Sequence, residues 1–398
     1  MHREHQRVFN LVDKEKSVNI TNDLKKHDLL VLVGAGASMH AKMPSVDRIT
    51  KKLRNCAKCK PDWVKSYNRK HPDYKYISHV THILEKVAGY SRLFGDYEKF
   101  IGYLQKIFTP TASDQSTLPM MLYNAAIHTI MELFHTRIAL NEEGKKNYRM
   151  LFEKYRMLIF TLNYDLVIEE YAKRIGEELY DGFNECQEFD AKLLDNEIEN
   201  NKHILAHMHG SVLFANHSLN KLVKHKTPQE ALCARLESSM FFKEQNGKLF
   251  ILSPIISGTE KYSAIKSTPV LFNYMEKFKE LSQNVNRILV IGYGGNDVHV
   301  NKYLDDRLSN DESRELRIAY VTKVDNPLLQ ECPPPEVLLT FPRTKNFSRK
   351  FGSGWDWISN DNRIVVRTTG FPLCSADMCL LTSHFTYDRE CPQNPGSP

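Results

Sequence analysis

Hydrophobic residues gather in short continuous runs along the chain, and most of the runs end next to small or polar residues. Such runs are typical of strands that helices cover on both faces, since strands with one exposed face alternate apolar and polar positions. Six strands of this kind are predicted: Leu29–Gly34, Arg156–Asn163, Ile204–Gly210, Leu249–Ile256, Arg287–Gly294 and Leu316–Lys323. Helical patterns such as Asp165–Gly176 and Thr268–Gln283 separate them. This alternation predicts an α/β fold with a doubly wound parallel sheet.

The interval between the first two strands holds roughly 120 residues, far more than one crossover helix needs. Apolar residues at helical spacing run through it, for example Ile49, Leu53 and Cys56. We therefore expect a helical insertion at about residues 47–150, packed beside the sheet.

The insertion belongs to a predicted domain at residues 28–325, which an N-terminal segment at residues 1–27 precedes. A C-terminal extension at residues 326–398 begins with a proline-rich stretch, contributes a strand at Arg363–Phe371, and ends in a tail expected to be disordered. The polar stretch Glu177–Asn201 is predicted to be an exposed connection. The basic stretch Asn216–Lys226 is predicted to be a loop that either is solvated or faces a phosphate.

The first apolar run stops in a glycine-rich turn, Gly34-Ala35-Gly36, with the hydroxyl of Ser38 at the start of the next element. Without a Cβ, Gly34 and Gly36 let backbone N–H groups approach an anion, and a following helix adds its positive dipole end. The turn predicts a phosphate site; a strand end that binds nothing is the alternative. A dehydrogenase fingerprint needs a third glycine where Met39 stands, and no GK[ST] follows, so hydride transfer and ATP hydrolysis are disfavoured.

Asn163 and Asp165 follow the second predicted strand, in the segment FTLNYD. A strand end of an open α/β sheet faces the ligand crevice, where Asn163 presents a neutral amide with donor and acceptor atoms. Asp165 is either a second ligand-binding group or the cap of the next helix.

His207 and His209 follow the third predicted strand, where we expect them to share a face and Gly210 to leave room for a ligand. An imidazole of ordinary pKa is suited to taking a proton at neutral pH, although His207 is also interpreted as a hydrogen-bonded core residue. No third ligand follows in the sequence, so no metal is expected.

A second glycine-rich strand end, GYGGND, follows the run at residues 287–291. Gly292, Gly294 and Asn296 are the residues that let a ribose or adenine lie close to the backbone there. Asp297 is interpreted as a further ligand-binding group or as the N-cap of the next helix.

Composition narrows the functions further. The formal net charge of +6 over 398 residues suits a small polyanionic ligand and does not call for nucleic acid. The sequence has neither the apolar core of a secretory signal nor a membrane-spanning run. Cys56 and Cys59 form a CxxC without a second CxxC to complete a zinc site, so reduced thiols and a cytoplasmic location are expected.

In their order and positions, GAGAS, FTLNYD, HMHGS and IGYGGND resemble the sirtuin-like (silent information regulator-like) family, over roughly residues 28–325. The resemblance implies a Rossmann-like sheet that binds NAD. It places Gly34, Ala35, Gly36 and Ser38 on the NAD phosphates, Asp165 at the same ligand, and the Gly292–Asn296 loop, with Gly294, beside the adenosine half. It also makes Asn163 and His209 the catalytic pair.

Four departures separate the chain from the protein-deacylating sirtuins. Leu162 replaces the glutamine of their T-Q-N motif, and MPSVDR at residues 43–48 only echoes their G-x-P-D-F-R segment. The two CxxC pairs of their zinc ribbon and their peptide-docking strand are missing. The chain is closer to the divergent branch of prokaryotic anti-phage defence, whose activity is cleavage of NAD.

The resemblance therefore implies a cytoplasmic NAD hydrolase that releases nicotinamide and ADP-ribose and depletes NAD on infection, with NAD as substrate and no metal. An NAD or ADP-ribose sensor without turnover, and an NAD-dependent protein deacylase, are the alternatives. Since such an enzyme must stay silent in healthy cells, a homo-oligomer or a HerA-like hexameric ATPase partner is expected to control it. No membrane or direct nucleic-acid binding is expected.

Overall fold

The computed structural model describes residues 28–62, 64, 74–107, 118–135, 138–218, 221–237, 242–245, 248–251, 253–258, 261–324, 332–344, 346–349 and 355–386. The predicted N-terminal segment at residues 1–27 and the predicted disordered tail lie outside these described residues.

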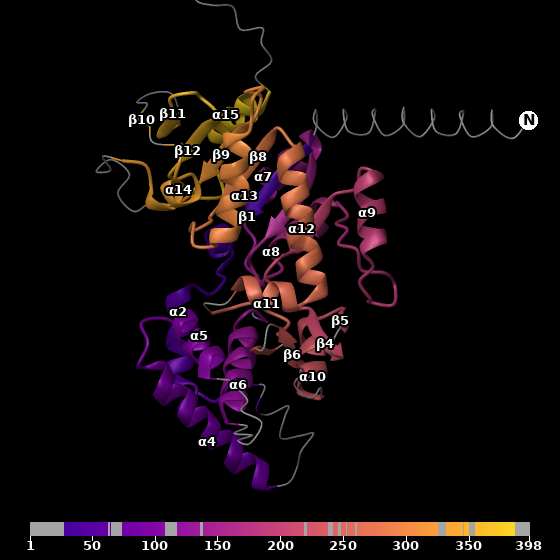
Figure 1. Cartoon of the computed structure of the whole chain (residues 1–398), viewed down its shortest axis with the longest axis vertical. Coiled ribbons are helices and arrows are strands. Elements are labelled where there is room, and N and C mark those ends of the chain that lie inside the picture. Colours follow the sequence, from indigo (N-terminus) through magenta and orange to yellow (C-terminus); the bar gives the residue numbers. More distant parts are fainter. Residues whose placement is uncertain are drawn as a thin grey trace, which may run out of the picture.

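An eight-stranded sheet with the order β10-β11-β12-β9-β8-β1-β2-β3 forms the centre of the molecule (Figure 1). Its strands are β1 (Asp28–Val33), β2 (Arg156–Thr161), β3 (Ile204–His207), β8 (Arg287–Ile291), β9 (Arg317–Val321), β10 (Phe347–Arg349), β11 (Trp357–Ser359) and β12 (Ile364–Arg367). The six strands from β12 to β3 are paired in parallel, and β10 and β11 add an antiparallel edge. The predicted doubly wound α/β sheet is thus confirmed.

Helices cover both faces of this sheet. Strand β1 shows why, because Leu29, Val31 and Val33 face one hydrophobic core while Leu30 and Leu32 face another. The first core is covered by α7 (Glu142–Lys154), α8 (Val167–Ile175) and α15 (Ser375–Phe385). The second is covered by α9 (Ala191–Glu199), α12 (Pro269–Asn284), α13 (Val298–Ser309) and α14 (Pro335–Thr340).

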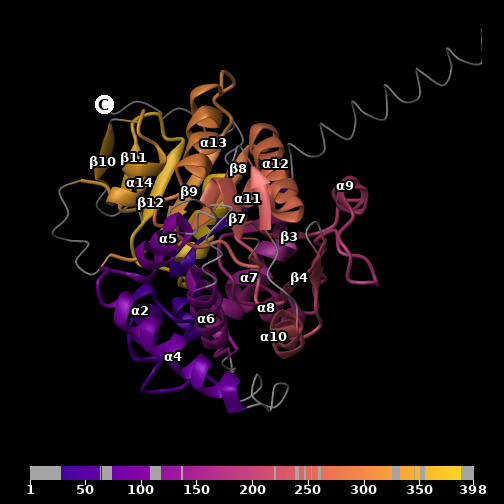
Figure 2. The same cartoon turned by 60° about the horizontal axis from the view of Figure 1, so that its bottom comes forward.

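The predicted helical insertion lies between β1 and β2. It begins with the 3-10 helix η1 (Ala35–Ala41) and continues with α2 (Val46–Asn55), α4 (Tyr74–Ser91), α5 (Tyr97–Ile107) and α6 (Leu118–Leu133). Helices α2, α4, α5 and α6, here called the helical module, stand together below the sheet in Figure 1 and come forward in Figure 2. Their apolar stripes are core, as predicted, since Ile49, Leu53 and Cys56 are all buried.

Three predicted elements differ from the structure. The run Leu249–Ile256 does not enter the central sheet: β7 (Lys248–Ile251) pairs with β6 (Phe242–Gln245) in a separate two-stranded sheet. A short apolar run fits a central strand and a separate hairpin equally well, so the hydrophobic periodicity did not distinguish the two. The predicted exposed connection at residues 177–201 contains α9, which buries Leu194 and Ile198.

The third difference concerns the predicted basic loop at residues 216–226, which is mostly a hairpin of β4 (Phe214–Ser218) and β5 (Lys221–Lys224). The charges of its lysines are already paired, because Lys221 forms an ion pair with Glu188 and Lys224 forms one with Asp181. Helix α10 (Pro228–Glu237) follows it, and α11 (Lys261–Ser267) precedes α12.

The chain after residue 325 completes the same sheet. The strand predicted at Arg363–Phe371 is confirmed as β12, which pairs in parallel with β9. The seven cysteines within the described residues are all free thiols. In the part of the chain that the structure describes, none of the helices is long and apolar enough to cross a lipid bilayer.

Two glycine turns interlock where β1 and β8 end. The backbone N–H of Gly34 donates to Ile291 O and that of Gly36 donates to Gly292 O, each at 2.9 Å. A Cβ on Gly34 would lie 2.6 Å from Gly292 O, and one on Gly292, whose φ is +60°, would lie 2.2 Å from the Ala37 N atom. The glycines are therefore required by the contact between the turns, whatever ligand the turns hold.

Gly292→Ala is expected to lower the free energy of unfolding by about 2–4 kcal/mol, because it adds backbone strain at positive φ and overpacks the contact with Ala37. Gly89→Ala is the matched control: it changes an exposed helical glycine with no atom within 4 Å of the new methyl group. It should raise stability by about 0.5–1 kcal/mol. Urea denaturation measures both, and equal stabilities of the two variants would contradict the required contact.

Candidate active site

A cavity of about 340 Å³ opens at the carboxyl ends of β1, β2 and β8. This is the point where the strand order reverses, since the chain builds β2 and β3 on one side of β1 and β8 and β9 on the other. Open α/β sheets bind ligands at this reversal. The other wall comes from α2, α5, the segment before α2 and Phe134, which follows α6. The lining residues are Gly34, Ala35, Gly36, Met43, Pro44, Val46, Ile49, Tyr97, Glu98, Phe134, Leu162, Asn163, Tyr164, Asp165, His209, Lys261, Gly292, Tyr293, Gly294, Asn296 and Asp297.

Asn163 is held in one orientation at the bottom of this cavity. The side chain is 6% exposed, and its Nδ2 donates to Gly34 O at 3.0 Å and to Ser38 Oγ at 3.1 Å. Since a carbonyl oxygen accepts and does not donate, the contact with Gly34 O fixes which end of the amide is nitrogen. The remaining acceptor, Oδ1, is the atom of Asn163 that suits a ligand hydroxyl or a water molecule.

Ser38 and Asp165 support this amide. Ser38 is buried outside the cavity lining and donates its hydroxyl to Asp165 Oδ1 at 3.1 Å, and Val167 N donates to the same oxygen. Burial raises the pKa of Asp165 to about 6, although both hydrogen bonds favour the ionised form. Asp165 therefore accepts from the first residue of α8, although the N-cap position itself is Leu166, and it also lines the cavity.

His209 presents a buried imidazole to the cavity. The side chain is 3% exposed, and burial lowers its pKa to about 3, with Asp297 partly opposing this effect. The imidazole is therefore neutral at neutral pH, and so low a pKa makes it a weak base in the chain without a ligand. Its Nε2 makes no hydrogen bond and lies 3.6 Å from Asp297 Oδ1.

Asp297, beside His209, is contacted by a charged side chain that no sequence motif marked. Lys261 Nζ lies 3.4 Å from Asp297 Oδ1 and 3.2 Å from Glu98 Oε1. Although burial favours the neutral form of Asp297, His209 and the Lys261 ammonium lower its pKa. Asp297 occupies the N-cap position of α13, yet its side chain does not cap the helix. In the sequence, Asp297 was recognisable as the last residue of the GYGGND motif. Lys261 and Glu98 belong to no motif.

His207 has the core role that one of its two interpretations gave, whereas the predicted shared strand face and the space for a ligand at Gly210 differ from the structure. Strand β3 ends at His207, so the two histidines do not share a strand face. His207 Nδ1 bonds to Asn163 O and its Nε2 to Glu169, which is the core role. Gly210 has φ +86°, and a Cβ there would lie 2.0 Å from Pro254 O, so a chain segment rather than a ligand fills that space.

The structure brings the predicted site residues together. The exposed lining residues of the two glycine turns are Ala35, Gly36, Gly294 and Asn296. The segment at residues 43–48 contributes Met43, Pro44 and Val46 to the lining. Leu162, next to Asn163 in the sequence, also lines the cavity.

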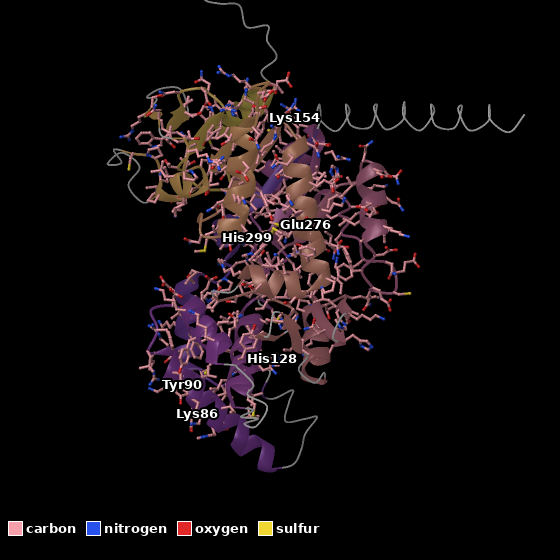
Figure 3. All side chains as sticks on the ribbon, viewed as in Figure 1. Lys86, Tyr90, His128, Lys154, Glu276 and His299 are labelled. Carbon is pink, nitrogen blue, oxygen red and sulfur yellow. The ribbon has the colours of Figure 1, made fainter. Side chains whose placement is uncertain are left out.

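His209, Asp297 and His299 are a group with metal-binding atoms. One ligand atom from each lies within 4.8 Å of the others. The sequence predicted no third ligand near the histidines, and the structure provides two, because α13 starts next to the end of β3. Figure 3 labels His299 near the end of α13 that faces the helical module.

The buried Asp165 makes folding pH-dependent. A carboxyl whose pKa rises from an ordinary value near 4 to about 6 on folding binds more protons in the folded state, so stability falls as pH rises through this interval. Relative to Asp165→Asn, the free energy of unfolding of the natural chain should fall by up to about 3 kcal/mol between pH 4 and pH 7. Glu169 and His207 are the titratable neighbours, and both variants retain them.

Urea denaturation across this pH range checks the difference. Asp190→Asn, which changes an exposed carboxyl at the start of α9, is the control and should follow the natural chain. Parallel pH profiles for Asp165→Asn and the natural chain would contradict the role given to burial.

A comparison with protein families gives a match to the part of the chain that begins in β2. Residues 157–334 match the family model described as the SIR2-like domain. The matched region holds Asn163, Asp165, His209 and the loop at residues 292–297, and it begins after the first glycine turn and the helical module. A comparison with curated proteins found no match. SIR2-like domains use NAD. Residues 157–334 are therefore similar to a SIR2-like domain, and this match supports a sirtuin-like family for that part of the chain.

Proposed function

We propose that this protein is an NAD hydrolase that cleaves the bond between nicotinamide and ribose. The observation that carries the proposal is the pairing of two buried groups at one cavity: the fixed amide of Asn163 and the neutral imidazole of His209. Their position at the reversal of the strand order, beside two glycine turns, fits a dinucleotide.

The glycine turns suit the two halves of NAD. Ala35, exposed at the start of η1, offers its backbone to the diphosphate, and Gly36, whose N–H donates to Gly292 O, leaves room there because it has no Cβ. Gly294 and Asn296, on the turn after β8, lie where the adenosine half would pass. The nicotinamide ribose would then lie between Asn163 and His209.

In this arrangement the C1′–N bond of the nicotinamide ribose breaks, and nicotinamide leaves as a neutral molecule. Positive charge develops on the ribose, and a water oxygen forms the new bond to C1′. Asn163 Oδ1 orients the water or a ribose hydroxyl without adding a charge, and His209 accepts the released proton. The products are nicotinamide, ADP-ribose and one proton.

The departures from deacylating sirtuins favour water over an acyl-lysine as the acceptor. Leu162 stands on the cavity wall where those enzymes have glutamine. In the region where a peptide-docking strand is expected, the described residues 253–258 are occupied by the chain itself: Ile256 N donates to His209 O, and Ile255 pairs with Gly210.

The proposal extends to the biological role implied by the sequence resemblance. The protein would act in the cytoplasm as an anti-phage effector that depletes NAD on infection. Control would come from a homo-oligomer or from a HerA-like hexameric ATPase. Size measurement of the purified chain, alone and with such an ATPase, tests this role, and a monomer that is fully active without a partner would contradict it.

Incubation of the purified chain with NAD should yield equal amounts of nicotinamide and ADP-ribose, identified by mass. Asn163→Ala and His209→Ala should each lower the rate by at least about 100-fold, because each removes a positioned group. Asn200→Ala, which changes an exposed asparagine at the end of α9, is the control and should keep full activity.

Two outcomes would replace the proposal by another function. NAD consumption that requires an acyl-lysine peptide would indicate a deacylase. Binding of NAD or ADP-ribose by the folded chain without any turnover would indicate a sensor.

A further inference from the structure

We propose that His209, Asp297 and His299 form a binding site for one divalent transition-metal ion, and that Zn²⁺ suits it best. The three come from the end of β3 and the first turn of α13, and their ligand atoms all lie within 4.8 Å of one another. Zinc bonds of about 2.0–2.1 Å in tetrahedral geometry place two ligand atoms about 3.3 Å apart. The distance of 3.6 Å between His209 Nε2 and Asp297 Oδ1 is close to that value.

Two of the three side chains have a buried polar atom without a hydrogen bond, namely His209 Nε2 and His299 Nε2. The partner of Asp297 Oδ1 is the Lys261 ammonium, at 3.4 Å. Buried polar atoms are nearly always paired, and two exceptions at one place need a cause. A shared ion satisfies both imidazoles at once, whereas a hydrogen bond between His209 and Asp297 would require a shorter distance.

Local charge decides whether a cation is tolerated. Lys261 opposes a metal ion, because its ammonium lies 3.4 Å from Asp297 Oδ1. Glu98 also pairs with Lys261, at 3.2 Å, so the three charged groups carry one net negative charge. Burial keeps imidazoles in the neutral form, which is the form that binds metals.

The chemical types of the ligand atoms determine which class of ion the site prefers. Two imidazole nitrogens and one carboxylate are ligands of Zn²⁺ and similar transition metals, while Ca²⁺ and Mg²⁺ prefer oxygen ligands. His209 and Asp297 line the cavity and His299 does not, so a fourth ligand would approach from the cavity. The ring of Tyr262 stacks on His299, with 5.2 Å between the ring centres, and holds it on this side of α13.

A bound ion would stop the proposed reaction. Zn²⁺ on Nε2 of His209 occupies the lone pair that takes the proton, so the ion would act as an inhibitor. This consequence rests on the proposed function, whereas binding of the ion does not.

Calorimetric titration of the chelator-treated full chain with ZnCl₂ tests the site. Exposed thiols such as Cys59 and Cys186 can also bind Zn²⁺, so the result is the difference between variants. His299→Ala should lose one equivalent of tight binding, with affinity at least about tenfold weaker. His299→Gln, which keeps more of the side-chain volume, should show the same loss. His82→Ala, on the exposed face of α4, should titrate like the natural chain.

Unchanged Zn²⁺ binding in both folded His299 variants, or no tight equivalent in the natural chain, would overturn the site. In the NAD assay, Zn²⁺ should inhibit the natural chain and His82→Ala, while inhibition of His299→Ala, measured against its own rate without Zn²⁺, should need at least about tenfold more Zn²⁺. Equal inhibition of His299→Ala would overturn the inhibitory role. A chain that binds Zn²⁺ through His299 but never cleaves NAD would contradict the proposed function alone.

Discussion

The contact between the two glycine turns is the constraint on which the candidate active site depends. Gly34 takes part in both directions: its N–H donates to Ile291 O at the end of β8, and its carbonyl accepts from Asn163 Nδ2 at the end of β2. One backbone unit therefore joins three neighbouring strand ends. Side chains on Gly34 or Gly292 would separate the turns, because the nearest backbone atoms lie 2.6 Å or less from the positions of their Cβ atoms. The geometry of the amide thus follows from the packing of the turns.

The two ends of the sheet differ in how their polar groups are paired. At the amino end, Arg156 makes a bidentate pair with Asp28 and also donates to Ile198 O and Asn201. Such a fully bonded pair stabilises a structure without needing a ligand. At the carboxyl end, His209 and its neighbours keep polar atoms without hydrogen bonds. Unpaired buried atoms are unfavourable for folding, and although Tyr155 Oη before β2 is also unpaired, the two imidazole nitrogens of His209 and His299 lie together, which favours a ligand there.

Much of the fold was predictable because its signals are local. Continuous apolar runs marked the strands, and the glycine turn after β1 marked the end of the sheet where the cavity opens. The run at residues 249–256 failed since four to eight apolar residues fit a hairpin as well as a central strand. The predicted shared face of His207 and His209 was wrong, because β3 ends at His207. Lys261 and Glu98 carry no sequence signal: they reach the site from α11 and α5, and only the fold brings them together.

A crystal structure of Asn163→Ala with NAD tests the central claim most directly, since the slow variant would retain the intact dinucleotide. The account predicts the diphosphate at Ala35 and Gly36, the adenosine half along Gly294 and Asn296, and the nicotinamide ribose beside His209. NAD bound elsewhere, or bound in this cavity with its nicotinamide ribose far from His209, would contradict it.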